Sequence, residues 1–165
     1  MDGLVNWFIE VLHGLSGEWV AFIISMVPLL ELRGGLLAAS LLNVPILRAI
    51  PICIIGNLIP VPFILWFITP IFDFLKRTRL FRPLVEKLEK SALGKSDKIQ
   101  KGYFWGLALF VGIPLPGTGA WTGSLIASLL NIPFKKAMPA VLVGVMIATI
   151  IMSIVSYGLL GAIIH

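Results

Sequence analysis

Long apolar runs dominate the chain, and polar residues interrupt them at few places. Four runs, at residues 19–43, 49–74, 103–130 and 137–164, are about as long as the roughly 20 residues that cross a bilayer as a helix. The runs at 49–74 and 137–164 contain few strongly polar residues, so each is predicted to be a transmembrane helix. The other two are broken near their middles, and a straight spanning helix fits neither well.

Both broken runs predict re-entrant helical hairpins. A proline, two charges and two glycines interrupt residues 19–43 between positions 28 and 35, and prolines and glycines at 112–119 interrupt residues 103–130. Two half-helices of about 9 to 12 residues, rising 1.5 Å per residue, would each reach halfway into the hydrocarbon core. One kinked spanning helix is the alternative, because neighbouring helices can satisfy a broken backbone.

The sequence repeats itself at a shift of 88 residues. Between residues 28 and 56, 12 of 29 ungapped positions are identical to those 88 residues further on, where about 3 are expected by chance. The matched residues include Pro28/Pro116, Gly35/Gly123, Asn43/Asn131, Pro45/Pro133, Pro51/Pro139 and Gly56/Gly144. The copies differ most where Glu31-Leu-Arg33 corresponds to Gly119-Ala-Trp121. We therefore predict two copies of one unit, residues 1–75 and 76–165.

Each copy also begins with an amphipathic segment. Residues 3–13 are too short to span a bilayer and predict an interfacial helix, whose apolar positions are Leu4, Val5, Phe8, Ile9 and Leu12. Residues 76–101 hold nine basic and three acidic side chains, a net charge of +6, and their first half has helical apolar spacing. A binding site for anionic lipid and a topogenic cytoplasmic loop both explain this charge.

Basic residues predict how the two copies are oriented. If each hairpin enters and leaves on one side, each copy crosses the membrane an odd number of times, and the second copy is inverted. Arg48 then lies outside, while residues 76–101 and Lys135-Lys136 place 11 of the 13 basic residues in the cytoplasm. The positive-inside rule favours this arrangement over parallel copies. Inverted repeats with broken helices are a recurring transporter architecture.

Composition agrees with a multi-pass protein of the cell (inner or plasma) membrane. The 165 residues are 58% hydrophobic and 13% charged, with a mean hydropathy of +1.01. Cys53 and two isolated histidines offer no disulfide or metal spacing, so we expect no metal and no cofactor. We expect no nucleic-acid partner. No nucleophilic, metal-ligand or paired-carboxylate constellation stands at membrane depth, so we expect no enzyme.

Glu31 and Arg33 are the candidate site residues of the first tip, together with Gly34 and Gly35. Charges at membrane depth cost about 2.5 to 3.5 kcal/mol on insertion scales, which makes each a functional hypothesis by default. Glu31 could exchange a proton, because burial opposes its charge while Arg33 favours it. Arg33 could hold an anionic headgroup. A structural ion pair between the two is the alternative.

The second tip contains no titratable group and offers backbone instead. Its candidate site residues are Pro116, Gly117, Thr118, Gly119, Trp121 and Thr122. Glycines allow successive N–H groups to point at one anion, and the threonines add hydroxyls. Small residues would equally let the two tips approach each other closely. Trp121 is either an interface anchor or one wall of an apolar cavity.

Residues 28–34 and 113–123 resemble the paired motifs of the small multidrug export family, and the similarity runs over essentially the whole chain. The layout is more distantly similar to the DedA-like membrane proteins. That resemblance implies two re-entrant hairpins and, for some members, transport of undecaprenyl phosphate or proton-dependent drug tolerance. The second tip departs from the DedA-like pattern because it lacks arginines.

These observations predict an all-α integral membrane transporter. Its function would be proton-coupled transport, or flipping, of an amphipathic or phosphate-bearing lipid substrate, and Arg33 favours the phosphate. Proton-coupled efflux of small cationic drugs is one alternative, and a non-transporting scaffold or lipid-binding protein is another. Membrane lipids and protons are the expected partners. A homodimer is also expected, because broken backbone at membrane depth needs protein to cover it.

Overall fold

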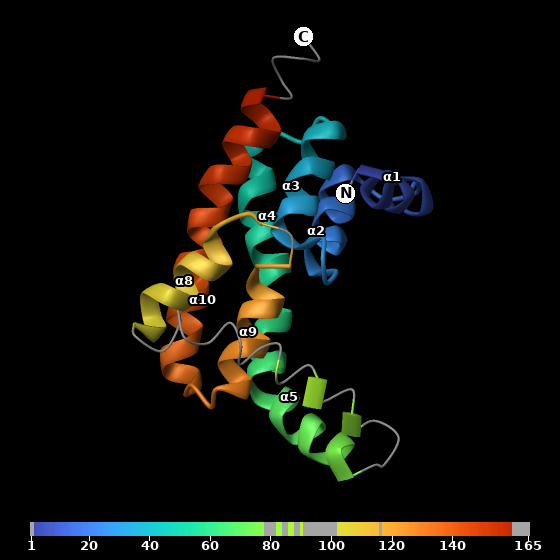
Figure 1. Cartoon of the computed structure of the whole chain (residues 1–165). Coiled ribbons are helices and arrows are strands. Elements are labelled where there is room, and N and C mark those ends of the chain that lie inside the picture. Colours follow the sequence, from blue (N-terminus) through green and yellow to red (C-terminus); the bar gives the residue numbers. More distant parts are fainter. Residues whose placement is uncertain are drawn as a thin grey trace.

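The computed structural model describes residues 2–77, 82–83, 86–87, 90, 102–115 and 117–159, and the regular elements in this part of the chain are all helices (Figure 1). The predicted all-α class is confirmed for it. The helices are α1 (Asp2–Val11), α2 (Gly17–Met26), α3 (Glu31–Leu41), α4 (Ile46–Leu58), α5 (Pro60–Arg77), α8 (Tyr103–Gly112), α9 (Ala120–Leu129) and α10 (Phe134–Ser153), followed by the π-helix η1 (Ile154–Leu159). Most of the predicted basic amphipathic segment at 76–101 lies outside the described residues.

Each broken apolar run forms two short helices rather than one kinked helix. α2 and α3 are separated by residues 27–30, where Leu29 has a φ of 77° and Glu31 opens α3 with a φ of 50°. α8 and α9 are separated by residues 113–119, where Gly117 and Gly119 have positive φ. Such left-handed backbone reverses a chain and does not continue a helix.

The two helix pairs are not equally closed. α2 packs along α3 and α4, so the first pair is a compact hairpin. α8 packs along α10 while α9 packs along α5, and α8 and α9 contact each other much less. The sequence repeat had predicted two equivalent hairpins, and the second is splayed because each of its arms packs on a different long helix.

The repeat reappears in the backbone at the end of α3 and of α9. Asn43 and Asn131 adopt left-handed φ values of 56° and 54°, at the position where a Schellman motif ends a helix. In both copies the next amide donates to the carbonyl five residues earlier at 2.9 Å, from Val44 to Ala39 and from Ile132 to Ala127. A proline then precedes each long helix. The sequence duplication is therefore also a duplication of local structure.

Two segments are long and apolar enough to cross a membrane by length and composition, Ile46–Ile68 and Phe134–Gly158. Both start about one turn before the predicted spans at 49–74 and 137–164, because Pro45 and Pro133 open the helices. Pro60 follows a break in the first segment at Ile59. Large apolar side chains on both segments are exposed, which suits lipid surroundings: Ile55, Phe63, Trp66, Phe67, Leu142, Met146, Ile150 and Ile154.

Figure 1 shows the directions of the long helices and of the two short helix pairs. α4 and α5 run down the view while α10 runs up it, and the two short helix pairs approach the middle of the molecule from opposite ends. α1 packs on the first hairpin through the fully buried Val5, whereas Leu4, predicted on the same face, is exposed. The loops that join α2 to α3 and α8 to α9 meet near the centre.

Candidate functional site

The site is the contact between these two loops, which we call tip 1 (residues 27–30 with the first turn of α3) and tip 2 (residues 113–119 with the first turn of α9). The Glu31 side chain is buried, and its carboxylate accepts hydrogen bonds from the backbone N–H groups of Ala120 and Trp121, each at 3.1 Å. The first N–H groups of a helix have no intrahelical acceptor and carry partial positive charge. Glu31 therefore caps α9 from the other repeat.

Gly119 makes this cap possible. The residue is buried with a φ of 141°, and a Cβ built there would overlap the Glu31 carboxylate. Its ψ of −173° completes a backbone conformation that is essentially restricted to glycine. The carboxylate thus occupies the space that any other side chain at position 119 would fill.

Arg33 binds the opposite side of tip 2, just after α8 ends. Its guanidinium donates to the carbonyl of Leu115, to the carbonyl of Ile113 at 3.3 Å, and to Thr118 at both the carbonyl (2.8 Å) and Oγ1 (3.0 Å). The Thr118 hydroxyl also lies 2.7 Å from the Ile113 carbonyl. A planar fork of donors suits several carbonyls held in one loop.

No ion pair joins Glu31 to Arg33 in the part of the chain that the structure describes. Residues two apart on a helix point to different sides, so the two charges diverge. In place of a direct ion pair, the two side chains make contacts across the repeats, and their functional role stays a prediction. Each side chain carries the charge opposite to that of the helix end it contacts.

Trp121 adds a hydrogen bond from tip 2 to the segment that precedes tip 1. Its indole N–H donates to the Met26 carbonyl at 3.2 Å, at the end of α2. Its ring also lines an apolar groove of about 470 Å³ beside tip 1 and α5. The other lining residues are Met26, Ile59, Pro60, Phe63, Ile64, Phe67, Ile68 and Ile71. Trp121 thus forms part of the wall of an apolar groove, and both of its predicted roles stay predictions.

The remaining predicted site residues divide into packing residues and loop residues. A Cβ on Gly34 would lie 2.8 Å from the Leu30 Cβ, and one on Gly35 would overlap the Ser25 hydroxyl, so both glycines permit close helix packing. Gly117 has a φ of 76° and open space around it. Thr122 is half-buried in the first turn of α9. Pro116 lies outside the described residues.

Several of the hydrogen-bonding partners in the site could not be predicted from the sequence. The acceptors for Arg33 and Trp121 are mainly backbone carbonyls, and the donors to Glu31 are backbone N–H groups. The predicted anion nest does include N–H groups at the start of α9, but the chain's own carboxylate occupies them. Backbone partners depend on the path of the chain, which residue types do not reveal.

The structure combines two long apolar helices with charged side chains that are buried between broken helices. These features are typical of an integral membrane protein with a polar site in its apolar interior. Residues 31–151 match the family described as "Putative small multi-drug export protein", and the chain belongs to this family. No curated protein and no solved structure matches the chain. The family indicates a small membrane transporter rather than an enzyme. The similarity to DedA-like proteins remains a prediction.

Proposed function

We propose that the protein exports amphipathic molecules in exchange for protons, with the contact of Glu31 and α9 as the gate. The observation that carries this proposal is that a buried carboxylate joins the two repeats through two N–H groups of the opposite tip. Transporters of inverted-repeat architecture bind substrate and coupling ion where their repeats meet. The opposite directions of the long helices in Figure 1 support that architecture and the re-entrant arrangement of both hairpins.

Proton binding would open this gate. The ionised Glu31 accepts two charge-assisted hydrogen bonds, each worth about 1.5 to 3 kcal/mol. A proton on the carboxyl group removes the charge that attracts the α9 N-terminus and leaves an O–H that needs an acceptor of its own. The contact is therefore strong while Glu31 is ionised and weak once it is protonated. Separation of the tips would then expose the site to the other side of the membrane.

The groove beside Trp121 is the proposed substrate site. Its lining is apolar and aromatic and carries no charged side chain, which suits the apolar body of an amphipathic molecule. Trp121 belongs both to the groove wall and to the gate, since its backbone N–H binds Glu31. A molecule that displaces the Trp121 ring would thereby disturb the gate.

A proton-driven uptake assay tests this proposal. Proteoliposomes with an imposed pH gradient should accumulate tetraphenylphosphonium, a lipophilic cation, and Glu31→Gln should reduce the gradient-driven rate by at least about tenfold while the protein stays folded. Glu10→Gln, the same change at an exposed carboxylate on α1, is the matched control and should transport as the wild type does. Equal rates and pH profiles for Glu31→Gln and the wild type would refute the gate.

Transport or flipping of a phosphate-bearing lipid is the second candidate, because Arg33 is a permanent cation next to the gate. Arg33 is bound to tip 2 in this structure, so a phosphate could reach it only after the tips separate. Arg33→Ala should then abolish binding of a phosphorylated polyprenyl lipid. For a cationic substrate the same variant should preserve or improve binding, because it removes a repelling charge. Titration of one variant with both ligands decides between the two.

Two further expectations depend on how the tips are covered. Leu29 of tip 1 is 78% exposed, and a broken backbone at membrane depth favours coverage by protein, so we propose a homodimer. If the protein is instead a non-transporting scaffold, Glu31→Gln and Arg33→Ala should lower the melting temperature and leave no activity to lose. Liposomes without any gradient-driven uptake would support that outcome.

A further inference from the structure

A second groove, of about 320 Å³, lies between α2 and α4, away from the residues that form the tip contact. Its lining consists of Glu18, Trp19 and Phe22 from α2 and Ile52 and Ile55 from α4. Glu18 and Phe22 are four residues apart and Ile52 and Ile55 three apart, so each pair lies on one face of its helix. The groove is apolar along its length and carries a carboxylate at the end where α2 begins.

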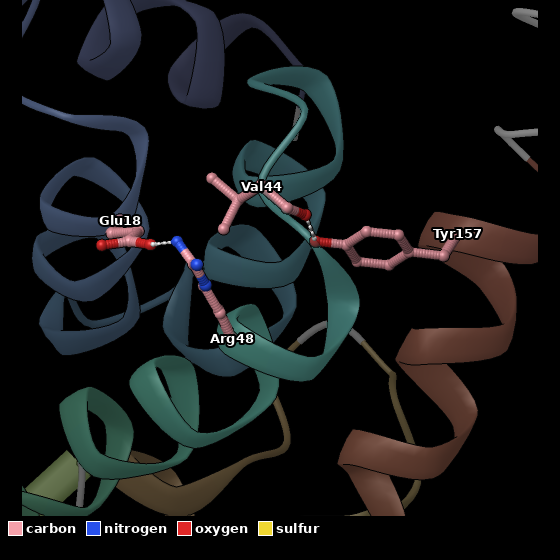
Figure 2. Close-up of polar contacts among 4 residues, drawn as sticks. All are labelled: Glu18, Val44, Arg48 and Tyr157. Carbon is pink, nitrogen blue, oxygen red and sulfur yellow. Dashed lines mark hydrogen bonds and ion pairs between the residues drawn. The ribbon is translucent and has the colours of Figure 1, made fainter.

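The carboxylate belongs to a loose ion pair. Glu18 Oε1 lies 3.3 Å from Arg48 Nη1, and Figure 2 shows the two side chains meeting between their helices. Charge-assisted hydrogen bonds between such groups are usually about 2.7 to 2.9 Å long. The Arg48 side chain is 71% exposed and that of Glu18 42% exposed, so both can take a partner from outside. The end of the groove therefore offers one negative and one positive group side by side.

The groove also has the amphipathic layout of a lipid–water boundary. Trp19 is 59% exposed beside Glu18, and its ring packs edge-on against Phe22 with centroids 5.9 Å apart. Tryptophan favours the headgroup level of a bilayer, with an apolar ring and a polar N–H. Ile55, further along the groove, is an apolar side chain that is 55% exposed. One continuous surface thus has a polar end that suits a lipid headgroup and an apolar part that suits an acyl chain.

We propose that this groove binds one zwitterionic phospholipid with a primary ammonium headgroup. Its ammonium group would bind Glu18, its phosphate would bind Arg48, and one acyl chain would lie along Phe22, Ile52 and Ile55. An anionic lipid would satisfy Arg48 but place its charge beside Glu18, and a cationic amphiphile would do the reverse. A primary ammonium has N–H donors for the carboxylate, which a quaternary ammonium lacks.

Other contacts hold the two walls of the groove in place. The Tyr157 hydroxyl donates to the Val44 carbonyl at 2.8 Å, which ties the turn before α4 to the last span (Figure 2). Gly56 lets α4 approach α2 so closely that a Cβ there would lie 2.7 Å from the Phe22 carbonyl. The walls are therefore positioned before a lipid arrives, which lowers the entropic cost of binding.

Lipid binding to the full-length protein in detergent, measured by native mass spectrometry, tests this proposal. Dioleoyl phosphatidylethanolamine should bind about tenfold more tightly than dioleoyl phosphatidylcholine or phosphatidylglycerol, a difference of about 1.4 kcal/mol. Glu18→Gln should lose this preference and bind phosphatidylglycerol better than the wild type does. Arg48→Gln should weaken phosphatidylethanolamine binding by a similar factor.

A variant that fills the groove provides an independent check. Ile55→Trp should weaken phosphatidylethanolamine binding, whereas Leu142→Trp, the same kind of change at an exposed apolar position on α10, should not. Equal binding of the three lipids to the wild type would overturn the proposal. So would a phosphatidylethanolamine preference that survives in Glu18→Gln, or phosphatidylethanolamine binding that Ile55→Trp leaves unchanged.

Discussion

Glu31 and Arg33 are two residues apart on α3, and this spacing sends their side chains to two different helix ends. The acid meets the positive end of α9, and the base meets carbonyls that follow the negative end of α8. The hydrogen bonds of both charges are thus made mainly with backbone groups of the opposite tip.

Gly119 gives a residue-scale test of the cap that leaves Glu31 itself unchanged. Gly119→Ala should lower stability by about 2 to 4 kcal/mol, because the new Cβ displaces the carboxylate and the backbone is strained. Gly117→Ala, at a φ of 76° with open space, should cost only about 1 kcal/mol. Thermal unfolding in detergent compares the two variants, and equal losses would mean that the Glu31 cap contributes nothing.

At the scale of elements, the helix breaks and the helix ends show which features a residue pattern can predict. The breaks near Pro28 and between positions 112 and 119 follow from residues that cannot continue a helix, so both helix pairs were predictable. The register of the repeat was also predictable, because Asn43 and Asn131 mark matching turns. The splayed arrangement of α8 and α9 was not predictable. It depends on the contacts of these helices with α10 and α5, which are distant in sequence, and a local residue pattern does not reveal such contacts.

The two asparagine caps predict matched stability changes. Asn43→Ala and Asn131→Ala should each cost about 1 kcal/mol or slightly more, because alanine resists the left-handed conformation that asparagine tolerates. Asn43→Gly and Asn131→Gly should restore or exceed the stability of the wild type, since glycine is the preferred residue at this position. Melting temperatures of the four variants check this order. A glycine variant less stable than its alanine counterpart would contradict it.

At the scale of the whole molecule, the long helices run in opposite directions in Figure 1, and we expect their first turns to lie on opposite sides of a bilayer. Leu47 is 84% exposed at the start of α4, and Lys135 is exposed at the start of α10. Figure 1 shows these two starts at opposite ends of the molecule. Parallel copies would instead place both on one side.

Cysteine labelling tests this topology. In a Cys53→Ser background, Leu47→Cys should react with a membrane-impermeant maleimide added to intact cells, and Lys135→Cys should react only after permeabilisation. The native Cys53 is buried, so removing it only lowers the background. Labelling of both positions from the same side would exclude the inverted arrangement.

The contact between the tips also sets an order of events during biosynthesis. Glu31 and its donor Trp121 are 90 residues apart in sequence. At a ribosomal rate of about 5 to 20 residues per second, the acid and base of tip 1 are made roughly 5 to 18 seconds before the backbone groups that will bind them. Throughout that interval the nascent first half carries both charges without their hydrogen-bond partners in tip 2. We therefore expect residues 31–33 to stay in a hydrated environment until the second half of the chain has been made.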